Sequence, residues 1–504
     1  MVLIPSHCFR QYDIRGIADE EFASAAVAQL GRAIGTYLLR YAPGRSKKVT
    51  VGRDARLSSP RLKDALAAGL ASAGLSVIDL GLCPTPALYF SLFHLKPRGG
   101  VMITGSHNPP EYNGFKVCAG KETLYGKEIQ KIGKLASNKS RPPAPLPARR
   151  AYRPEGRAFS PEGKIRSKEI IPDYIDFMVK HFRGLKARAG KQKGFKVVLD
   201  SGNGTAGLVA PEILRRLGVR AVELYSRPDG RFPHHHPDPT VPENMRDLIR
   251  TVAREKAAAG IGYDGDADRI GVVDPEGRIV WGDALMAIFA RAILRENPGA
   301  TIIGEVKCSQ VMYDEITRAG GRAIMWKTGH SLIKKKMKEE KALLAGEMSG
   351  HLFFADRYFG YDDAIYASLR LVELLLKSRK SLSQWVGELP AACATPEIRV
   401  DCREEEKFGI VAGLKEFLSD AGRVESHFGL APRGVVTVDG IRLTFDRGWV
   451  LARASNTQPA LVLRYEAEDE QVLKQLQGAF EKLLKKVSKS RPPTADGRPP
   501  KKPK

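Results

Sequence analysis

The sequence lacks several features that would place it at a membrane or outside the cell. None of its 504 residues belongs to an apolar run of about 18 or more, so we expect no transmembrane helix and no membrane partner. The first ten residues show no basic segment followed by an apolar stretch and a small-residue cleavage site, so we expect no secretory signal. The six cysteines are scattered and form no CxxC pair, which favours free thiols over disulfides or a zinc site. Together these absences predict a cytoplasmic location.

Acidic residues are too few to balance the basic ones, and the net charge is +24. Residues 134–168 contribute +8 of this charge and residues 485–504 contribute +7. Both segments are rich in proline and poor in apolar residues, which predicts a surface insertion near 136–165 and a disordered basic tail at 489–504. Attraction to a polyanion is the alternative. No aromatic residues interleave the charges of the tail, so we expect no nucleic-acid partner.

Short β-branched runs alternate with helical patterns through most of the chain, and the alternation restarts twice. The alternating segments are 49–54, 58–73, 76–81, 87–94 and 100–104, then 196–200, 206–217, 221–225 and 243–258, then 301–306, 310–319, 322–326 and 331–339. This βαβ rhythm predicts an α/β fold with three related domains, each with a mainly parallel mixed sheet covered by helices.

The last part of the chain has a different pattern, in which strand-like segments outnumber helical ones. The strand patterns are 397–400, 434–438, 440–444 and 449–454, and the helical patterns are 406–421 and 469–486. They predict a smaller C-terminal α+β domain. We therefore expect domains at 1–160, 161–278, 279–390 and 391–488, followed by the tail at 489–504.

The first chemical motif is the segment 100–110, GVMITGSHNPP. A β-branched strand enters a glycine turn that would expose Ser106 at the strand's carboxyl edge, where α/β folds place their sites. A serine hydroxyl needs activation to act as a nucleophile, and His107 is adjacent. An ordinary strand-to-turn junction would use the same residue types, so spacing alone leaves both interpretations open.

The second motif places Asp264, Asp266 and Asp268 two residues apart, with glycine and alanine between them. Such a loop can direct several carboxylate oxygens at one hard cation. An EF-hand is excluded, because Arg269 and Pro275 stand where its glycine and final glutamate belong. Three ligands and an open position suit a catalytic metal, and a solvated acidic turn is the alternative.

Two weaker motifs carry groups that bind sugars and phosphates. The segment 346–351, GEMSGH, offers hydrogen bonds to sugar hydroxyls from Glu347, Ser349 and His351. The segment 453–459, RASNTQP, offers a phosphate cradle made by Arg453, Ser455, Asn456 and Thr457. Either segment alone is also compatible with an ordinary polar loop.

The four motifs in this order resemble those of the α-D-phosphohexomutases. The flanking segments 9–16 (FRQYDIRG) and 112–116 (YNGFK) also resemble that family, as do Lys307 and His330 in their local contexts. The resemblance covers residues 4–488 apart from the Pro/Arg-rich insertion. The methionine of GEMSGH and the run SHNPPEYNGFK are most similar to the bacterial phosphomannomutase/phosphoglucomutase branch.

The resemblance implies four domains around one cleft and a catalytic phosphoserine at Ser106. It further implies Mg²⁺ bound by Ser106 and the carboxylates of Asp264, Asp266 and Asp268, with Arg269 adding positive charge at the transferred phosphoryl group. The implied acid, base and charge-stabilising candidates are Arg15, Lys116, His107 and His330. Which of them is the general base stays open.

The implied reaction interconverts hexose 1-phosphate and hexose 6-phosphate, of mannose or glucose, through a hexose 1,6-bisphosphate. The loop at Arg453, Ser455, Asn456 and Thr457 would hold the phosphate that is not reacting, while Glu347, Ser349 and His351 would contact the sugar. Further contacts that change between the two substrate orientations would come from Tyr12, Lys307 and His330. We expect a monomer.

Three other functions compete with this one. A phosphoglucosamine or acetylglucosamine phosphate mutase would use the same chemistry on another sugar. A metal-dependent sugar phosphatase would hydrolyse its phosphoenzyme, but it would not require the separate phosphate loop at Arg453. A non-enzymatic polyanion-binding protein would need neither Ser106 nor the acidic loop at Asp264.

Overall fold

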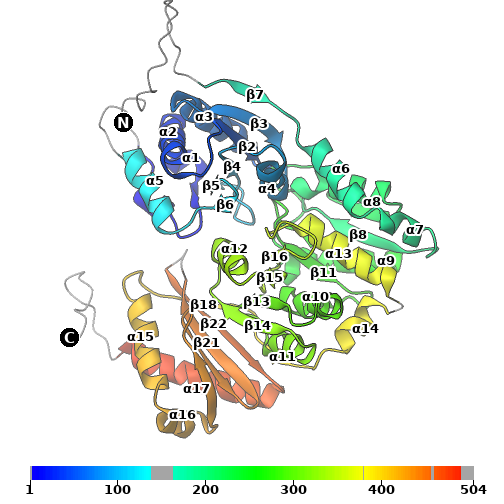
Figure 1. Cartoon of the computed structure of the whole chain (residues 1–504). Coiled ribbons are helices and arrows are strands. Elements are labelled where there is room, and N and C mark those ends of the chain that lie inside the picture. The colour runs from blue at the N-terminus through cyan, green and yellow to red at the C-terminus, as the bar shows by residue number, and fades with distance from the viewer. Residues whose placement is uncertain (1–2, 138–162, 379, 456–458, 490–504) are drawn as a thin grey trace, which may run out of the picture. The chain divides into compact units, whose positions relative to one another are not determined.

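The structure is a computed structural model, and it describes residues 3–137, 163–378, 380–455 and 459–489 (Figure 1). Most of the predicted insertion near 136–165, residues 490–504 of the predicted tail at 489–504, and Asn456 and Thr457 lie outside these described residues. Within the described part of the chain, no helix is both long and apolar enough to cross a membrane. All six cysteines are free.

The chain divides into two compact units that do not follow the sequence order strictly. The first unit comprises Met1–Val280, Ser349–Leu352 and Tyr361–Ser383. The second comprises Trp281–Met348, Phe353–Gly360 and Gln384–Lys504.

The first sheet belongs to the first unit and has the strand order β1-β5-β4-β2-β3-β7, with β6 paired to β5. Its strands are β1 (Ile14–Ile17), β2 (Lys48–Arg53), β3 (Ser76–Leu82), β4 (Gly99–Ile103), β5 (Tyr112–Ala119), β6 (Glu122–Thr123) and β7 (Ile165–Ser167). Strand β2 runs parallel to β3 and β4, whereas β5 is antiparallel to β1 and β4. The helices in this part are η1 (Ser6–Cys8), α1 (Ala18–Glu21), α2 (Ser24–Tyr41), α3 (Ser59–Ser72), α4 (Thr85–His94) and α5 (Lys127–Ser137).

Helices α2 and α3 pack closely against each other, and α3 also packs against β2 and β3 of this sheet. Leu30 and Ile34 on α2, and Leu66 and Leu70 on α3, are spaced four residues apart, so each pair lies on one helix face and is buried in a single core. Glycine allows the close approach: a Cβ at Gly69 would lie 2.0 Å from the carbonyl oxygen of Ala28 on the facing helix. This core supports the sheet whose carboxyl edge carries the Ser106 loop.

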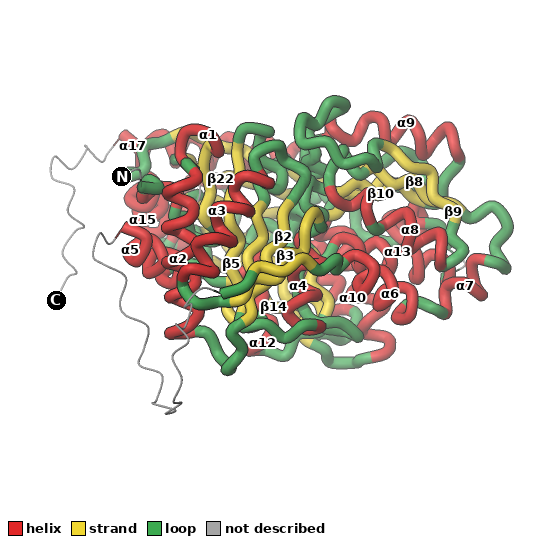
Figure 2. Tube along the Cα trace, turned by 90° about the horizontal axis from the view of Figure 1, so that it is seen from above, coloured by secondary structure: helices red, strands yellow, loops and turns green. Residues whose placement is uncertain are grey.

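The second sheet of the first unit has the order β12-β11-β10-β8-β9. Its strands are β8 (Lys196–Asp200), β9 (Arg220–Leu224), β10 (Ala259–Tyr263), β11 (Ile270–Val273) and β12 (Ile279–Val280). Strands β8, β9 and β10 are parallel and lie side by side in Figure 2, while β11 turns back antiparallel to β10. The accompanying helices are α6 (Ile171–His181), α7 (Gly184–Ala189), η2 (Thr205–Leu208), α8 (Ala210–Arg216), η3 (Pro242–Met245), α9 (Arg246–Glu255) and α13 (Ala364–Lys377).

The second unit contains the remaining two sheets. One has the order β14-β13-β15-β16, formed by β13 (Thr301–Glu305), β14 (Arg322–Trp326), β15 (Leu344–Gly346) and β16 (Leu352–Phe354). The helices of this region are α10 (Gly282–Glu296), α11 (Gln310–Arg318), α12 (His330–Glu339) and α14 (Leu382–Gly387).

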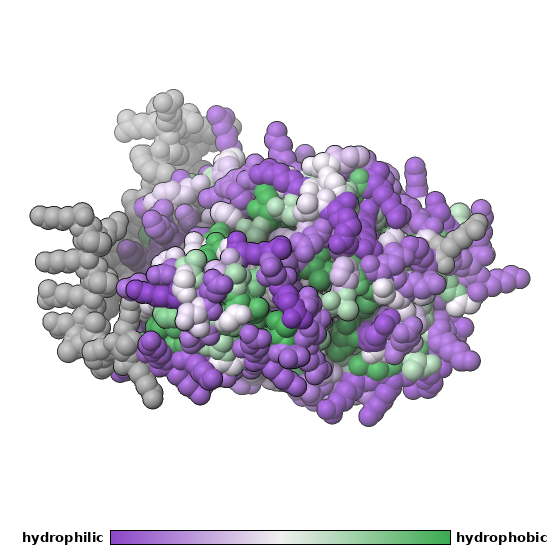
Figure 3. All heavy atoms as spheres, turned by 90° about the horizontal axis from the view of Figure 1, so that it is seen from below, coloured by the Kyte–Doolittle hydropathy of each residue, from purple (hydrophilic) through white to green (hydrophobic). Residues whose placement is uncertain are grey.

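The C-terminal sheet is antiparallel, with the order β17-β22-β21-β20-β19 and β18 paired to β22. Its strands are β17 (Cys393–Ala394), β18 (Ile398–Asp401), β19 (Pro432–Val436), β20 (Ile441–Phe445), β21 (Gly448–Ala454) and β22 (Ala460–Ala467). It packs against α15 (Lys407–Leu418), α16 (Ala421–Phe428) and α17 (Glu470–Lys489) through one apolar core. On the face of the molecule in Figure 3, hydrophilic side chains predominate, with apolar residues in smaller areas between them.

The predicted fold class is confirmed: three mixed α/β sheets are followed by an α+β sheet. Three predicted helices differ in detail, and the segment 406–421 is one of them, because α15 ends at Leu418 and α16 begins at Ala421. The segment 206–217 is divided into η2 and α8, because Pro211 has no N–H to continue a helix across it. The segment 243–258 ends at Glu255, where Lys256 adopts a left-handed conformation with φ of 50° before β10 begins. The predicted domain boundaries stay predictions.

Candidate active site

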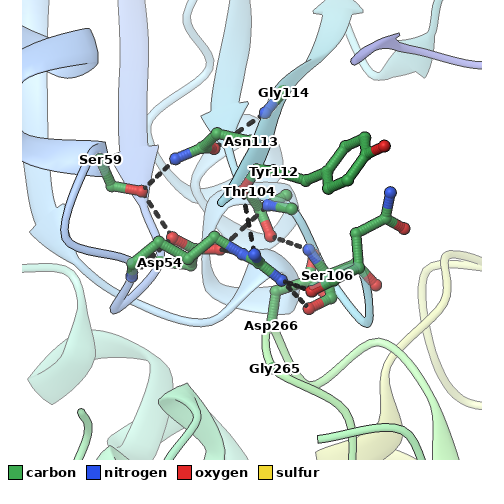
Figure 4. A network of polar contacts seen from close by, with 12 residues as sticks. Asp54, Ser59, Thr104, Ser106, Tyr112, Asn113, Gly114, Gly265 and Asp266 are labelled. Atoms are coloured by element: carbon green, nitrogen blue, oxygen red, sulfur yellow. Dashed lines mark hydrogen bonds and ion pairs between the residues drawn. The ribbon is translucent and has the colours of Figure 1, made fainter. Parts of the chain in front are cut away.

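Ser106 lies in the loop that follows β4, and its side chain points toward the acidic loop. Its hydroxyl donates a 2.7 Å hydrogen bond to Asp264 Oδ2 and lies 3.2 Å from His107 Nδ1. The backbone N–H of Ser106 donates to Thr104 Oγ1 at 2.8 Å, a contact shown in Figure 4. Ser106 has a positive φ of 50°, which a residue with a Cβ adopts only when surrounding contacts hold it there.

The three aspartates occupy the hairpin loop between β10 and β11. Asp264, Asp266 and Asp268 are fully buried, and one carboxylate oxygen of each lies within 4.8 Å of the others. Burial and the neighbouring charges of Asp268 and Asp266 raise the pKa of Asp264 well above its usual value. Such a cluster is costly without a compensating cation, and three oxygens from one tight loop are the ligands that a hard divalent metal prefers. The residues therefore fit a metal site.

Lys116, on β5, places a buried ammonium group against this loop. Its Nζ donates to Asp266 Oδ2 at 2.7 Å and also forms an ion pair with Asp268. Burial would lower the pKa of Lys116, but the attraction of these two carboxylates more than offsets it and raises the pKa. For the carboxyl of Asp266 the effect of burial is opposite and would raise the pKa, but the positive charge of Lys116 lowers the pKa overall. Thr85 donates to the same Asp266 oxygen at 2.6 Å.

Arg15, on β1, approaches the Ser106 loop from another strand. Its guanidinium donates to Asn108 Oδ1 at 2.9 Å and to the carbonyl of Gly105 at 3.2 Å, and it pairs with Asp13 at 2.7 Å. Burial, together with the positive charges of Arg269 and Arg15, lowers the pKa of His107 well below its usual value. The ring of His107 is therefore held in its neutral form.

A second buried cluster adjoins the acidic loop. Arg269 Nε donates to His351 Nε2 at 3.0 Å. The other ring nitrogen, His351 Nδ1, lies 3.4 Å from Asp362 Oδ2 and 3.6 Å from Asp268 Oδ1. Asp268, His351 and Asp362 also have the composition and spacing of a metal-binding group.

In the second unit, charged side chains gather where β13 ends. Lys307 Nζ lies 2.9 Å from Glu397 Oε2 and 3.6 Å from Glu305 Oε1. Burial would lower the pKa of Lys307, but Glu305 and Glu397 raise it overall. Lys307 in turn lowers the pKa of Glu397 to about 2. Glu305 also accepts a 2.6 Å hydrogen bond from Thr328 Oγ1, so it joins the β13 end to the loop before α12.

Two predicted substrate-binding residues are tied to this region. Glu347 Oε1 accepts a 2.6 Å hydrogen bond from the backbone N–H of Gly329, the residue before His330 at the start of α12. Arg453 Nε donates to Asp439 Oδ2 at 3.0 Å, and Asp439 Oδ2 accepts from the N–H of Thr328 at 3.1 Å.

The predicted site residues thus form two groups, one in each unit. The first unit holds Tyr12, Arg15, Ser106, His107, Lys116, Asp264, Asp266, Asp268, Arg269, Ser349 and His351. The second unit holds Lys307, His330, Glu347, Arg453 and Ser455.

Family models match the chain along almost its whole length. They are described as the phosphoglucomutase/phosphomannomutase α/β/α domains I, II and III and the C-terminal domain, and they match residues 6–142, 172–277, 281–393 and 397–483. The chain belongs to the phosphoglucomutase/phosphomannomutase family.

Relatives in this family cover nearly all of the chain. The phosphomannomutase/phosphoglucomutase of Pseudomonas aeruginosa is 42% identical over 97% of this chain and 98% of its own. The phosphoglucomutase of Neisseria gonorrhoeae is 37% identical over 96% of this chain and 98% of its own. The crystal structure of a phosphoglucomutase/phosphomannomutase family protein from Burkholderia thailandensis superposes with a TM-score of 0.83 at 36% identity, covering 96% of this chain and 98% of that one.

Membership in the phosphoglucomutase/phosphomannomutase family makes the chain a hexose phosphate mutase, an isomerase-type phosphotransferase. The family is metal-dependent, and the buried carboxylates of Asp264, Asp266 and Asp268 can hold the ion.

Several residues that contact the predicted site residues carry no motif of their own. Asp362, Thr85 and Glu305 reach their partners only through the tertiary fold, and nothing in their local sequence distinguishes them. Asp54 and Arg56 are different, because they follow the buried strand β2 just as Ser106 follows β4, and strand-end polar residues are a recognisable signal.

Proposed function

We propose that the enzyme interconverts the 1-phosphates and 6-phosphates of mannose and glucose through a phosphoserine at Ser106 and a hexose 1,6-bisphosphate. The observation that carries this proposal is the 2.7 Å hydrogen bond from Ser106 to Asp264, at the edge of a buried acidic loop. A phosphatase would hydrolyse the phosphoenzyme, whereas a mutase returns the phosphoryl group to the sugar. The names of the P. aeruginosa and N. gonorrhoeae relatives favour the mutase.

The groups around Ser106 suit phosphoryl transfer, which depends mainly on positioning and electrostatic stabilisation. Lys116, Arg15 and Arg269 supply positive charge against the oxygens of the transferred group. Mg²⁺ bound by Asp264, Asp266 and Asp268, with Ser106 as a further ligand, would supply additional neutralising charge.

Proton transfer to and from the sugar hydroxyl needs a group within reach of the reacting oxygens. His107 is one candidate, because its Nδ1 lies 3.2 Å from the Ser106 hydroxyl. Arg15, Lys116 and His330 are the other candidates. A lysine flanked by two carboxylates, such as Lys116, holds its proton firmly and is better suited to stabilising charge.

Other predicted site residues are proposed to bind the part of the substrate that does not react. Arg453 and Ser455, with Asn456 and Thr457, would hold the distant phosphate, and binding energy gained there helps to orient the reacting end. The sugar hydroxyls would be contacted by Glu347, Ser349 and His351, and the contacts that differ between the two orientations by Tyr12, Lys307 and His330.

A substrate panel tests this proposal directly. Turnover of mannose 1-phosphate, glucose 1-phosphate, glucosamine 1-phosphate and N-acetylglucosamine 1-phosphate is measured beside the release of free phosphate. We expect isomerised mannose and glucose phosphates with little free phosphate. Preference for the amino sugars would assign the chain to the glucosamine mutases, and stoichiometric phosphate release would make it a phosphatase. Sedimentation velocity tests the expected monomer.

A further inference from the structure

A fully buried arginine lies directly beneath the Ser106 loop. Arg56 follows β2, and none of its side chain is exposed. Its guanidinium donates to the backbone carbonyls of Ser106 at 2.8 Å and Tyr112 at 2.9 Å, and also to those of Asn108 and Pro109. One rigid, planar group therefore ties together four carbonyls along the loop that carries the proposed phosphoserine.

Asp54 holds this arginine from the opposite side. Its Oδ2 lies 3.2 Å from Arg56 Nε and accepts a 3.1 Å hydrogen bond from the backbone N–H of Gly105. Its Oδ1 accepts a 2.6 Å hydrogen bond from Ser59 Oγ, as Figure 4 shows. Asp54 thus links the base of α3 to the residue immediately before Ser106. Because both members of the pair are buried and hydrogen-bonded, their geometry is closely defined.

The glycine before Ser106 is required by this arrangement. A Cβ at Gly105 would lie 2.4 Å from both Cζ and Nε of Arg56, so any other residue would push the loop off the guanidinium. The loop therefore lies flat on Arg56 at the point where Ser106 takes its positive φ of 50°. Arg56 holds the carbonyl of Ser106 and three carbonyls after it, and Asp54 holds the N–H of Gly105 before it, so the loop is fixed on both sides of the strained residue whose hydroxyl is directed at Asp264.

Arginines also bind backbone carbonyls elsewhere in this unit. Arg61 donates to the carbonyls of Phe22 at 2.7 Å and Ala18 at 3.2 Å and pairs with Asp19, but it touches no residue of the Ser106 loop. Arg61 therefore shows what a purely structural arginine of this kind looks like. The contrast between the two arginines separates general stabilisation of the fold from control of the serine.

We propose that Arg56, held by Asp54, is a positioning residue that sets the direction of the Ser106 hydroxyl and so controls the rate of phosphoryl transfer. The inference rests on the proposed role of Ser106. Lysine cannot replace Arg56, because one ammonium group with three donors cannot span four separated carbonyls.

The test compares Arg56→Ala, Arg56→Lys and Arg61→Ala in the full-length enzyme, with kcat, KM and melting temperature measured for each. We expect kcat to fall about a hundredfold for both Arg56 variants, the loss that follows from misplacing a reacting group by about 1 Å. KM should change less than about threefold, which corresponds to ~0.7 kcal/mol of binding free energy, because Arg56 acts on the Ser106 loop and not on the substrate. Arg61→Ala should lower the melting temperature and leave kcat near that of the wild type.

Chemical rescue distinguishes positioning from loss of stability. Guanidinium chloride, at concentrations far below those that unfold the protein, should restore part of the kcat of Arg56→Ala, with sodium chloride at equal ionic strength as the control. Equal rescue by sodium chloride, or kcat within threefold of the wild type in either Arg56 variant, would overturn the inference. If Arg56→Ala does not fold, Arg56→Lys, which keeps the charge, decides the outcome by its kcat alone.

The failure of the proposed function gives a different result. If the wild type stays unphosphorylated and inactive after incubation with hexose 1,6-bisphosphate, the role of Ser106 itself is refuted. An active wild type together with fully active Arg56 variants would refute only the role of Arg56.

Discussion

The Ser106 hydroxyl donates a 2.7 Å hydrogen bond to Asp264 Oδ2, although the two residues are 158 positions apart and follow strands of different sheets. Ser106 follows β4 in the first sheet, and Asp264 directly follows β10 in the second. A second link joins the same regions, because the N–H of Thr85 donates to the carbonyl of Asp266 at 2.9 Å. The proposed nucleophile and the proposed metal loop are therefore held together by both side-chain and backbone contacts.

Replacing Ser106 by alanine should lower mutase turnover by several orders of magnitude, because a covalent route is lost with the hydroxyl. The fold should persist, since the change removes one oxygen. Mass spectrometry of the wild type should locate a phosphate on the peptide that contains Ser106. Ser91→Ala, at an equally buried serine whose hydroxyl donates to Leu88 O, is the matched control and should stay active. A fully active Ser106→Ala enzyme would refute the phosphoserine.

Asp266→Asn should weaken metal binding and abolish turnover, because the three buried carboxylates supply the anionic ligands together. Chelation should inactivate the wild type reversibly, with Mg²⁺ restoring activity. The control is Asp274→Asn. Asp274 is fully buried outside the acidic loop and accepts hydrogen bonds from the side chains of Arg278 and Ser383. This substitution is expected to lower thermal stability while leaving the activity dependent on metal. Undiminished wild-type turnover in excess chelator would exclude a catalytic metal at this loop.

The parallel strands were predictable from the sequence because each is a short, nearly continuous run of apolar residues bounded by polar turns. Strands that are buried on both faces show no alternation of apolar and polar residues. The strand 196–200 and the strand 322–326 have the bounds of β8 and β14. The antiparallel strands β5 and β22 were not predicted. In β5, Lys116 interrupts the apolar pattern, and it is buried only because Asp266 and Asp268 neutralise it. A local pattern does not reveal such a distant partner.

The same reasoning explains which site residues were found. Ser106 and the three aspartates lie in short motifs whose spacing carries their chemistry. Asp362 lies in no such motif, and its relation to His351 depends on a segment that folds back into the first unit. The residues Asp54 and Arg56 act through the loop rather than on a substrate, so their position after β2 signals a polar strand end but does not reveal this role.

Arg453→Lys should raise KM for hexose phosphates about tenfold. A hydrogen bond between the guanidinium and a phosphate contributes ~1.5–3 kcal/mol, and it is weakened when lysine replaces the planar guanidinium. The effect on kcat should be smaller, since Arg453 is proposed to hold the phosphate that does not react. Arg447→Lys is the control, since Arg447 pairs with Asp469 on an exposed part of the same domain. An unchanged KM in Arg453→Lys would remove Arg453 from the proposed phosphate loop.

The pairing of His235 with Asp200 should make the stability of the enzyme depend on pH. His235 Nε2 lies 3.0 Å from Asp200 Oδ2 at the end of β8. Burial would lower the pKa of His235, but hydrogen bonding and attraction to Asp200 outweigh it, so the pKa is raised. The protonated ring is therefore favoured in the folded state. Its stabilisation is fully present below the unfolded pKa of about 6.5 and is lost as pH rises through the higher folded value.

The measurement is the melting temperature of the wild type and of His235→Gln across this pH range, by scanning calorimetry. The wild type should exceed the variant by more at pH 5.5 than at pH 9, where the ring is neutral in both states. Asp200→Asn supplies the matched control. In that background, His235→Gln should change the melting temperature by the same amount at every pH, because the carboxylate that favours the protonated ring is gone. A difference that stays constant from pH 5.5 to 9, or one that grows toward high pH, would show that His235 is not held protonated by Asp200.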